Sequence, residues 1–491
     1  MPPTLGLDLG GGLPAPVDGR LVEVAVDAPA GPGPRTYTYL EPPGLGDLEP
    51  GEAVLVPFGR GGRQAIGIVV GEGTAPEGGE VRSIAARVRS DGPLLPALSL
   101  AFAAELSTRY LAPLAVVIRA MLPPGMLERL ELMAEVTPAG EARMGLEGSG
   151  LSPLEVDLLD ELAGRARAVR DLTSPEGRAA LLRRLRALAD EGLVELTWTL
   201  LGAAVGPRYE RRLWITDDGL AAAGSITGGD RLPGRPLGHR QKAALAELAS
   251  TEPFPQEGLP AAPVVERHGS SSIAGLVRRG LLRSEVRERP RRPLASRPAP
   301  TRGARPEGSS LTPDQAAAVR LVMDGLAAGD PTPILLDGVT GGGKTAIYVE
   351  AIAVALAAGR PALLLVPEIA LASPIVDRLR ADLAARIAVM HSALGEGERA
   401  DEWRRIRAGE ADLVVGTRTA LLAPLADVGL IIVDEEHDAA YKSDRTPRFQ
   451  ARDAALDLAR IAGGAVVLGS ATPAVETMGH ARAGRYRRAV L

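Results

Sequence analysis

The sequence predicts a multidomain α/β protein with a small β-rich part at the front, a helical middle part, and a C-terminal lobe built on a parallel sheet. Short β-branched segments separated by Gly and Pro come first, and two similar helical segments follow. From Leu311 onward, apolar runs alternate with helical patterns. With 491 residues, the chain is also too long for a single hydrophobic core.

Composition narrows the classes of function. Apolar residues make up 45% and charged residues 24%, as in ordinary globular proteins. The chain has no cysteine, which excludes disulfides and thiol chemistry and fits a reducing compartment, so we expect a cytoplasmic protein. The first nineteen residues carry no Lys or Arg, no apolar run reaches the length of a membrane span, and no membrane partner is expected. A net charge of -5 gives no global argument for nucleic acid.

Residues 1–125 are interpreted as one domain. Four short strands are predicted at 21–28, 35–40, 52–59 and 64–72, because these segments are β-branched or alternating and lie between Gly/Pro turns. A helical stretch follows and ends at Pro123–Gly125. This pattern indicates a small β domain that could close as a barrel.

Residues 126–290 contain an imperfect duplication. In each copy an amphipathic helix is followed by a second helix that ends at Gly-Leu and enters a strand, as in "LLRRLRALADEGLVEL" and "SSSIAGLVRRGLLRSEV". We interpret the copies as two winged-helix-like modules, which either bind DNA or act as spacer and protein-contact domains. Residues 291–307 form a basic, Pro-rich linker; a solvated linker is favoured over a segment that tracks phosphates.

Residues 308–491 are predicted to form one lobe. Six apolar runs from Pro333 to Leu468 are separated by helical patterns, which indicates a parallel sheet covered on both faces. Ligands on such sheets bind at the carboxyl ends of the strands, so the polar residues that follow each run are the candidate site residues.

The first apolar run leads into "GVTGGGKT", which matches the phosphate-binding pattern G-x-x-x-x-G-K-[ST]. Glycines let backbone N–H groups surround a triphosphate, Lys344 would reach its β- and γ-phosphates, and the Thr345 hydroxyl would hold Mg²⁺. The predicted nucleotide-binding residues are Gly338, Thr340, Gly341, Gly342, Gly343, Lys344 and Thr345.

The fifth run ends in "DEEHD". Asp434 is predicted to bind the same Mg²⁺ as Thr345, and Glu435 is the candidate base for an attacking water, so NTP hydrolysis is the predicted reaction. His437 is expected to relay the state of the nucleotide. Glu436 and Asp438 are expected to be solvated loop residues.

D-E-x-H together with "SAT" at Ser470–Thr472 resembles the superfamily-2 helicases and translocases, whose first motor lobe is RecA-like. That resemblance implies that "GSATP" (Gly469–Pro473), "GTRTA" (Gly416–Ala420, with Arg418) and "VPEIAL" (Val366–Leu371) line a nucleic-acid track and couple it to the nucleotide. It also implies that Gln315 in "LTPDQ" contacts adenine, which makes ATP the expected nucleotide.

Motifs near both ends of the chain resemble a single, narrower family. "LLLVPEIAL", "IIVDEEHDAAYKSD" and "VVLGSATPAVET" near the C-terminus, with "RTYTYL" and "PGEAVLVPFGR" near the N-terminus, resemble the PriA family of bacterial replication-restart helicases. The family implies a 3′-to-5′ DNA helicase that acts at stalled or branched forks and assembles the primosome. Its implied partners are branched and single-stranded DNA, primosome proteins and single-strand-binding proteins.

The family also implies DNA-binding residues. A 3′-OH terminus would be bound near Tyr37, Thr38, Gly59 and Arg60, where Thr38 stands in place of the family's acidic residue. An aromatic-rich loop after D-E-x-H would sense single strands, here with Tyr441, Arg448 and Phe449. The family's zinc-binding cysteines and second lobe are not in this sequence, so zinc is expected only in a missing C-terminal region, and the chain is interpreted as a fragment.

Three hypotheses therefore stand. The first is an ATP-dependent DNA helicase, of which this chain alone binds ATP and DNA but hydrolyses slowly and does not unwind. The second is a non-unwinding, fork-binding scaffold for primosome assembly, and the third is another superfamily-2 translocase such as a restriction-type motor. The front end "RTYTYL" argues against the third, and the intact Lys344 and Asp434 argue against a decayed motor.

Overall fold

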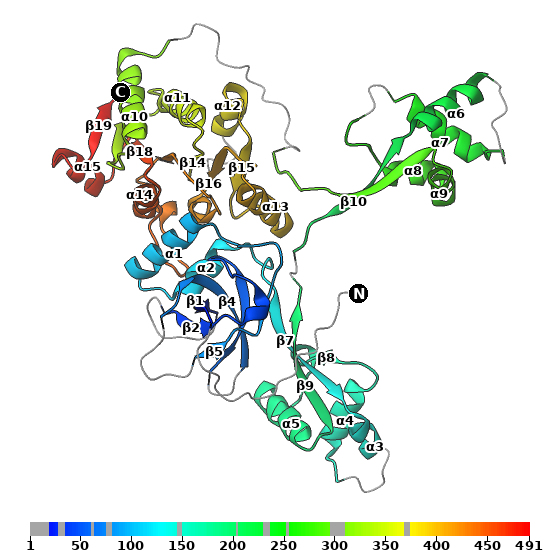
Figure 1. The fold of residues 1–491 in the computed structure, drawn as a ribbon. Coiled ribbons are helices and arrows are strands. Elements are labelled where there is room, and N and C mark those ends of the chain that lie inside the picture. The colour runs from blue at the N-terminus through cyan, green and yellow to red at the C-terminus, as the bar shows by residue number, and fades with distance from the viewer. Residues whose placement is uncertain are drawn as a thin grey trace. The chain divides into compact units, whose positions relative to one another are not determined.

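The computed structural model describes residues 19–27, 35–59, 63–74, 81–144, 150–202, 205–228, 236–251, 255–294, 310–367 and 374–491. The chain divides into two compact units (Figure 1). One combines Met1–Val205 with Pro293–Leu491, and the other is Gly206–Arg292. The predicted nucleotide site around Lys344 and the predicted 3′-end site around Tyr37 both lie in the first unit.

The predicted N-terminal strands form one sheet, in the order β5-β2-β1-β4-β3-β6. Along β1, Val22, Val24 and Val26 point into a core within the sheet, while Ala25 belongs to a second core on the other side. This is the period of two that an alternating strand requires. The strands are β1 (Leu21–Val26), β2 (Tyr37–Leu40), β3 (Ala53–Phe58), β4 (Arg63–Glu72), β5 (Arg82–Ser83) and β6 (Ala86–Arg87).

The segment 82–87 joins the two ends of this sheet. Its first half pairs with β2 and its second half with β3, and only Ile84 and Ala85 separate the two halves. Because β2 and β3 flank the β1–β4 pair on opposite sides, the segment curls the sheet into a small barrel around Ile84. The sequence suggested a barrel, but it did not predict these two short strands, which are only two residues each.

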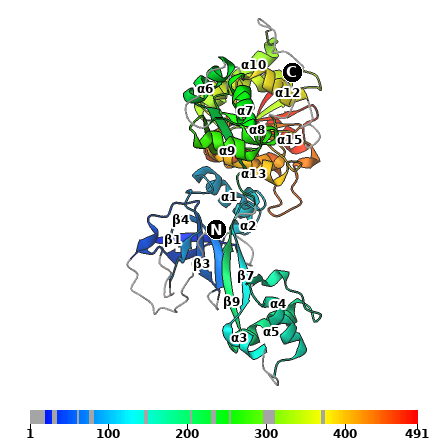
Figure 2. The same cartoon turned by 90° about the vertical axis from the view of Figure 1, so that its right-hand side faces the viewer.

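The helical stretch before Pro123 is two helices, α1 (Ala97–Arg109) and α2 (Leu114–Met121). They break at Leu111, which has a φ of 51°, and at Pro113, which disfavours helical backbone in the residue before it. In both views α1 and α2 lie between the barrel and the C-terminal lobe (Figures 1 and 2).

The internal duplication appears as two modules with nearly the same order of elements; the short η2 of the first stands where the second has the helix α8. Each has a three-stranded antiparallel sheet with its first long strand in the middle, and the orders are β8-β7-β9 and β11-β10-β12. The first module has β7 (Arg129–Val136), α3 (Pro138–Met144), α4 (Pro153–Leu162), β8 (Arg167–Ala168), η2 (Val169–Asp171), α5 (Arg178–Asp190) and β9 (Val194–Leu201). The second has β10 (Tyr209–Ile215), α6 (Asp217–Gly228), α7 (His239–Ala249), β11 (Leu259–Pro260), α8 (Ala261–His268), α9 (Ser270–Arg278) and β12 (Leu282–Glu288).

An equivalent hydrogen bond in the two modules supports the duplication. Thr137 Oγ1 donates to Gly192 O at 2.7 Å, and Thr216 Oγ1 donates to Gly280 O at the same distance in the second module. Three residues after each threonine is a glycine whose Cβ would lie 2.2 Å or 2.1 Å from the carbonyl oxygen of the leucine that follows the accepting glycine. The Gly-Leu ends recognised in the sequence are therefore the points where each module closes on its first helix.

The C-terminal lobe has a seven-stranded parallel sheet in the order β15-β16-β14-β17-β18-β13-β19. All six predicted strands are present, and β19 is additional. Its strands are β13 (Ile334–Asp337), β14 (Ala362–Leu365), β15 (Ile387–Met390), β16 (Leu413–Gly416), β17 (Leu430–Asp434), β18 (Ala465–Ser470) and β19 (Arg487–Val490). Its helices are α10 (Pro313–Ala328), α11 (Lys344–Ala357), α12 (Pro374–Asp382), α13 (Glu396–Arg407), η4 (Arg418–Leu422), η5 (Ala439–Tyr441), α14 (Ala451–Ala462) and α15 (Val475–Arg482).

The two faces of this sheet are covered by different helices. Leu363 and Leu365 pack into one core, while Ala362 and Leu364 pack into the other. The second core contains residues of α10, α11 and α12; the first contains residues of α13 and α14 together with α1 and α2. The N-terminal helices therefore share a continuous core with the lobe.

Directional contacts fix this shared core. Trp403 is fully buried, and its Nε1 donates to Met121 O at 2.9 Å. Arg109 Nη1 donates to both carboxylate oxygens of Asp457 at 2.7 Å. A half-exposed ion pair contributes about 0–1 kcal/mol, whereas each buried apolar side chain contributes roughly 1.5–3 kcal/mol. Apolar burial, rather than charge, therefore holds these parts together.

Candidate functional site

The glycine loop connects β13 to α11 as the sequence predicts. Gly341 has a φ of 82° and Gly343 a φ of 87°, in the left-handed region that costs glycine little. Gly343 is the N-cap of α11, so the free N–H groups and positive dipole end of that helix face the loop. This arrangement suits the binding of phosphate groups.

Lys344 reaches back across the loop. Its side chain is buried, and Nζ donates to Gly338 O at 2.9 Å and lies 3.4 Å from Glu435 Oε1. The loop and the D-E-E-H segment, ninety-one residues apart from Lys344 to Glu435, are therefore brought together at one edge of the sheet. A buried ammonium group in a glycine loop is the donor expected for a polyphosphate.

Asp434 ends β17 and is held by two tyrosines. Tyr348 OH, from α11, donates to Asp434 Oδ1 at 2.8 Å, and Tyr441 OH donates to the backbone carbonyl of Asp434 at 2.6 Å. Burial raises the pKa of Asp434, and it is opposed by the Tyr348 hydrogen bond and by Lys344. Burial, with Asp434 beside each hydroxyl, raises the pKa of both tyrosines, so they remain donors.

Gly469 makes room for Tyr348. A Cβ at Gly469 would lie 1.8 Å from Tyr348 OH, which is far inside van der Waals contact. Gly469 pairs with Asp434 between β17 and β18. The hydroxyl of Tyr348 occupies the space that a side chain at Gly469 would fill, and from there it reaches the Asp434 carboxylate. The glycine of "GSATP" is thus required by packing next to Asp434.

Glu435 and His437 connect the D-E-E-H segment with the "SAT" loop. Glu435 has a φ of 47°, a left-handed conformation that non-glycine residues rarely adopt and that is concentrated at functional sites. His437 Nδ1 lies 2.8 Å from Ser470 Oγ, and its Nε2 lies 3.3 Å from Thr472 Oγ1. Glu435 Oε2 lies 3.7 Å from His437 Nδ1 and accepts a hydrogen bond from Ala471 N at 3.4 Å, so Glu435 is linked to the "SAT" loop both directly and through His437.

The expectation for Glu436 was wrong, because its side chain is fully buried rather than solvated. Its carboxylate accepts hydrogen bonds from Ala474 N, Thr477 Oγ1 and Arg452 Nη1 at 2.7, 2.9 and 3.2 Å. Glu436 therefore holds the start of α15 against α14. Asp438 is also structural, since it accepts from Ala440 N and caps η5.

Gln315 lies against the glycine loop. Its Nε2 donates to Gly342 O at 3.3 Å, while its Oε1 accepts from Thr312 N in a capping box at the start of α10. A Cβ on Gly343 would lie 2.2 Å from Gln315 Nε2. The predicted adenine contact thus sits next to the loop, with its amide turned toward the loop backbone.

The residues present fit an Mg²⁺–nucleotide. A helix N-terminus and the buried Lys344 suit phosphates. The partly buried carboxylate of Asp434 and the hydroxyl of Thr345 are oxygen ligands of the kind that Mg²⁺ uses together with phosphates. When bound, the ion would neutralise charge on the phosphate oxygens. The assignment of Asp434, Glu435 and Thr345 to these roles stays a prediction.

The predicted 3′-end residues lie on the barrel. Tyr37 packs its ring against Phe58, with centroids 5.0 Å apart, and Gly59 O accepts from Arg82. Thr38 Oγ1 donates to Glu23 Oε1 at 2.5 Å, and these two residues are directly opposite on β2 and β1. The fourth predicted residue, Arg60, and most of "VPEIAL" lie outside the described residues.

The loop after D-E-E-H is tied to the lobe. Tyr441 and Phe449 are 1% and 3% exposed, so neither offers a ring face to a base in this conformation. Arg418 Nη1 donates to Ala440 O and Lys442 O at 2.7 and 3.0 Å. Arg448, by contrast, is exposed.

Sequence reasoning missed two residues beside the sites, Tyr348 and Glu23. It included Gly469 in the "GSATP" loop but did not predict that Gly469 packs against Tyr348. Tyr348 follows Lys344 by four residues, so both lie on the same face of α11, and this spacing could have identified it. Glu23 becomes visible only through strand register, which the sequence does not specify.

Within the described part of the chain, no helix has both the length and the apolar character of a membrane span.

Comparisons with known proteins match both ends of the chain. The DEAD/DEAH box helicase family model matches residues 312–479, and a 3′ DNA-binding domain (3′BD) model matches residues 23–123. The replication restart protein PriA of Bacillus subtilis (strain 168) is 31% identical over 472 residues, covering 95% of this chain and 55% of that protein. The PriA protein of a Synechocystis species is 33% identical, covering 92% and 52%.

The chain thus spans about half the length of these curated relatives. A solved structure of RecG bound to a three-way DNA junction matches at 23% identity with a TM-score of 0.30, covering 37% of this chain and 24% of that one. The fold is the multidomain α/β fold that the sequence predicts, with a β-rich front and a helicase-type lobe on a parallel sheet.

Proposed function

Because this chain belongs to the family of the replication restart protein PriA, we propose that it carries the end-binding part and first motor lobe of an ATP-dependent 3′-to-5′ DNA helicase. In this proposal the protein recognises stalled or branched replication forks in the cytoplasm and restarts replication by primosome assembly. Its partners are branched and single-stranded DNA, primosome proteins and single-strand-binding proteins.

The observation that supports the motor most directly is the 3.4 Å approach of Lys344 Nζ to Glu435 Oε1. In the proposed mechanism Lys344 exchanges Gly338 O for phosphate oxygens, which frees Glu435 to orient a water and accept its proton. Thr345 and Asp434 would hold the Mg²⁺, and Tyr348 fixes the Asp434 carboxylate by a hydrogen bond. His437 passes the change to Ser470 and Thr472.

The 491-residue chain is expected to bind ATP and single-stranded DNA but to hydrolyse ATP slowly and not to unwind. Superfamily-2 motors use an arginine from a second lobe that is worth orders of magnitude in rate. Steady-state phosphate release and strand separation on a forked substrate would measure this. Rapid DNA-stimulated unwinding by this chain alone would contradict it.

The two modules at 126–290 are proposed to be winged-helix-like and to help hold branched DNA. The barrel is proposed to bind a 3′-OH terminus beside Tyr37, Thr38, Gly59 and Arg60. The 2.5 Å bond from Thr38 Oγ1 places the carboxylate of Glu23 where it can accept a hydrogen bond from a sugar hydroxyl. Glu23 thereby supplies the acid that the resemblance places at residue 38.

Glu23→Gln is expected to reduce discrimination for a 3′-OH end. Binding of the full chain to oligonucleotides that end in 3′-OH or 3′-deoxyribose should show a preference of roughly tenfold in wild type, the worth of one charge-assisted hydrogen bond. The variant should lose most of it while its affinity for the 3′-deoxy end stays the same. Glu285→Gln, on β12 of the other unit, is the matched control. An unchanged preference in Glu23→Gln would remove Glu23 from the site.

A further inference from the structure

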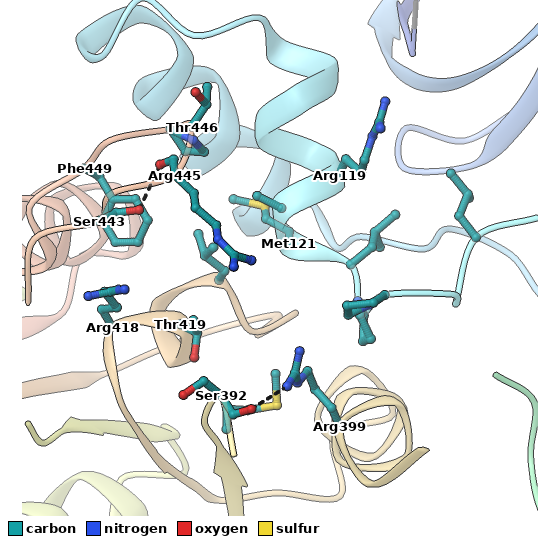
Figure 3. A pocket seen from close by; sticks show the side chains of 18 of the residues that line it. Arg119, Met121, Ser392, Arg399, Arg418, Thr419, Ser443, Arg445, Thr446 and Phe449 are labelled. Atoms are coloured by element: carbon teal, nitrogen blue, oxygen red, sulfur yellow. Dashed lines mark hydrogen bonds between the residues drawn. The ribbon is translucent and has the colours of Figure 1, made fainter. Parts of the chain in front are cut away.

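The long edge strand of the first duplicated module has a free outer side in the part of the chain that the structure describes. There β9 pairs only with β7, and both views show the two strands lying side by side (Figures 1 and 2). It contributes no residue to the pocket between the end of α2, the start of η4 and the loop at 443–449 (Figure 3). A free edge presents unpaired N–H and C=O groups, which form a template for another strand.

The hydrogen-bond pattern shows which residues of β9 face this free edge. Just before the β7–β9 ladder, Thr137 N donates to Leu193 O at 3.0 Å, and the register then runs without a shift along the whole strand. Successive residues of an antiparallel strand turn their backbone groups to opposite sides, so Leu193 and every second residue after it face β7. The N–H and C=O groups of Leu196, Trp198 and Leu200 therefore point outward.

Two of these residues also expose large apolar side chains. Val194 is buried in the core of the module, and Leu196 packs against that core. Because side chains alternate with a period of two, Trp198 and Leu200 lie on the same face of the strand. They are 42% and 37% exposed. An apolar stripe thus lies directly beside unpaired backbone groups.

The sequence of this edge is its own reverse. Residues 196–200 read "LTWTL". Two copies that pair antiparallel around a two-fold axis at Trp198 would place every residue of this segment opposite a residue of the same type. The resulting Trp–Trp and Thr–Thr pairs are of the kinds that stabilise neighbouring strands, and the Leu–Leu pairs continue the apolar stripe. Because Trp198 faces outward, a pair centred on it is also a hydrogen-bonded pair.

The second module provides an internal comparison. Its edge strand β12 follows Gly280 as β9 follows Gly192, so the two strands are equivalent. Four of the seven residues of β12 are charged, whereas β9 has one charged residue in eight, Glu195. Charged side chains protect an edge strand from unwanted pairing. The edge of β12 therefore has this protection, and the edge of β9 lacks it.

We propose that β9 pairs with β9 of a second copy of this chain, antiparallel around Trp198, so that two three-stranded sheets form one six-stranded sheet. The inference does not depend on the proposed ATPase or on DNA binding. An isologous contact of this kind uses the same surface on both copies, so association ends at two chains. One strand edge is a small interface, and the dimer is therefore expected to be weak and concentration-dependent.

Sedimentation of the full chain, without nucleotide or DNA, tests the contact. The average mass should rise from that of one chain toward that of two between roughly 1 and 300 µM. Trp198→Lys sets two like charges opposite each other at the axis and should weaken association about tenfold. Val286→Lys, at the equivalent exposed position of β12, should change nothing. Equal effects of the two substitutions, or a single chain at every concentration, would overturn the proposal.

Disulfide cross-linking tests the register. The chain has no cysteine, so Thr197→Cys and Thr199→Cys each give a protein with one thiol. In the proposed register residue 197 of one copy opposes residue 199 of the other, with Cα atoms about 4.5 Å apart, which a disulfide can bridge. The two residues 197 would lie about 7–8 Å apart, which is too far. Under mild oxidation, a mixture of the two variants should cross-link at least fivefold more than either alone.

The outcomes separate this contact from the proposed function. The cross-linking pair keeps Trp198, so it tests the contact even where Trp198→Lys does not fold. Equal cross-linking of each variant with itself would refute the register. If the chain binds ATP and oligonucleotides but stays single, the dimer proposal fails and the proposed function stands. If it pairs through β9 and binds neither ligand, the proposed function fails and the dimer stands. Assemblies larger than two chains would overturn the two-fold contact.

Discussion

The Lys344→Ala variant is expected to bind ATP roughly ten- to one-hundred-fold more weakly than the wild-type chain, because a hydrogen bond between charged groups contributes about 1.5–3 kcal/mol. Lys344 is the buried cation of the glycine loop, and its loss also leaves Glu435 without its nearest positive charge. Titration with a fluorescent ATP analogue measures the effect. Wild-type affinity in the variant would contradict the nucleotide site.

Two comparisons sharpen this test. Lys242→Ala removes an exposed lysine from the other compact unit and should leave ATP affinity unchanged. Binding of forked DNA by Lys344→Ala, with and without ATP, separates a motor from a scaffold. A motor loses the effect of ATP on DNA affinity, because linkage between the two ligands requires ATP to bind. Under the scaffold hypothesis, the Lys344→Ala variant keeps every measurable activity.

Gly469→Ala is expected to destabilise the lobe by about 1–3 kcal/mol, the usual cost of forcing extra atoms into a packed site. The new methyl group would lie 1.8 Å from Tyr348 OH, and Tyr348 is fully buried with its hydroxyl bonded to Asp434. Urea denaturation measures the free energy of unfolding. Gly479→Ala, a glycine of α15 with open space around its Cβ, should be neutral or stabilising.

Tyr348→Phe makes this test specific. Alone it should cost about 0.5–1.5 kcal/mol through the lost hydrogen bond to Asp434. Combined with Gly469→Ala it should be less harmful than the sum of the two, because the phenyl ring lacks the oxygen that collides with the methyl group. Strict additivity in the double variant would show that the collision is relieved in another way.

The sequence predicted the parallel sheet because its strands are buried on both faces and read as continuous apolar runs. It did not predict β19, since "RRAV" is a half-exposed edge strand without such a run. It predicted that Lys344 and the D-E-E-H segment meet, because parallel strands carry their ligands at one edge. Strand order was needed to find that Tyr348 crosses Gly469 to reach Asp434.

The motifs did not predict which of their side chains are buried. Tyr441 and Phe449 suggest a stacking loop, but the rings fill the core beneath it. Glu436 suggests a solvated loop, but Arg452 and Thr477 come from distant helices to meet it. For Glu436 the partners lie sixteen and forty-one residues away, in helices whose placement depends on the whole fold.

The core that Trp403 shares with α1 and α2 limits how the barrel can move relative to the C-terminal lobe. A swing between the N-terminal helices and the lobe would expose the Trp403 side chain, which is now fully buried. The barrel is therefore a fixed arm of the lobe. Any rotation of the lobe would therefore carry the barrel through the same arc.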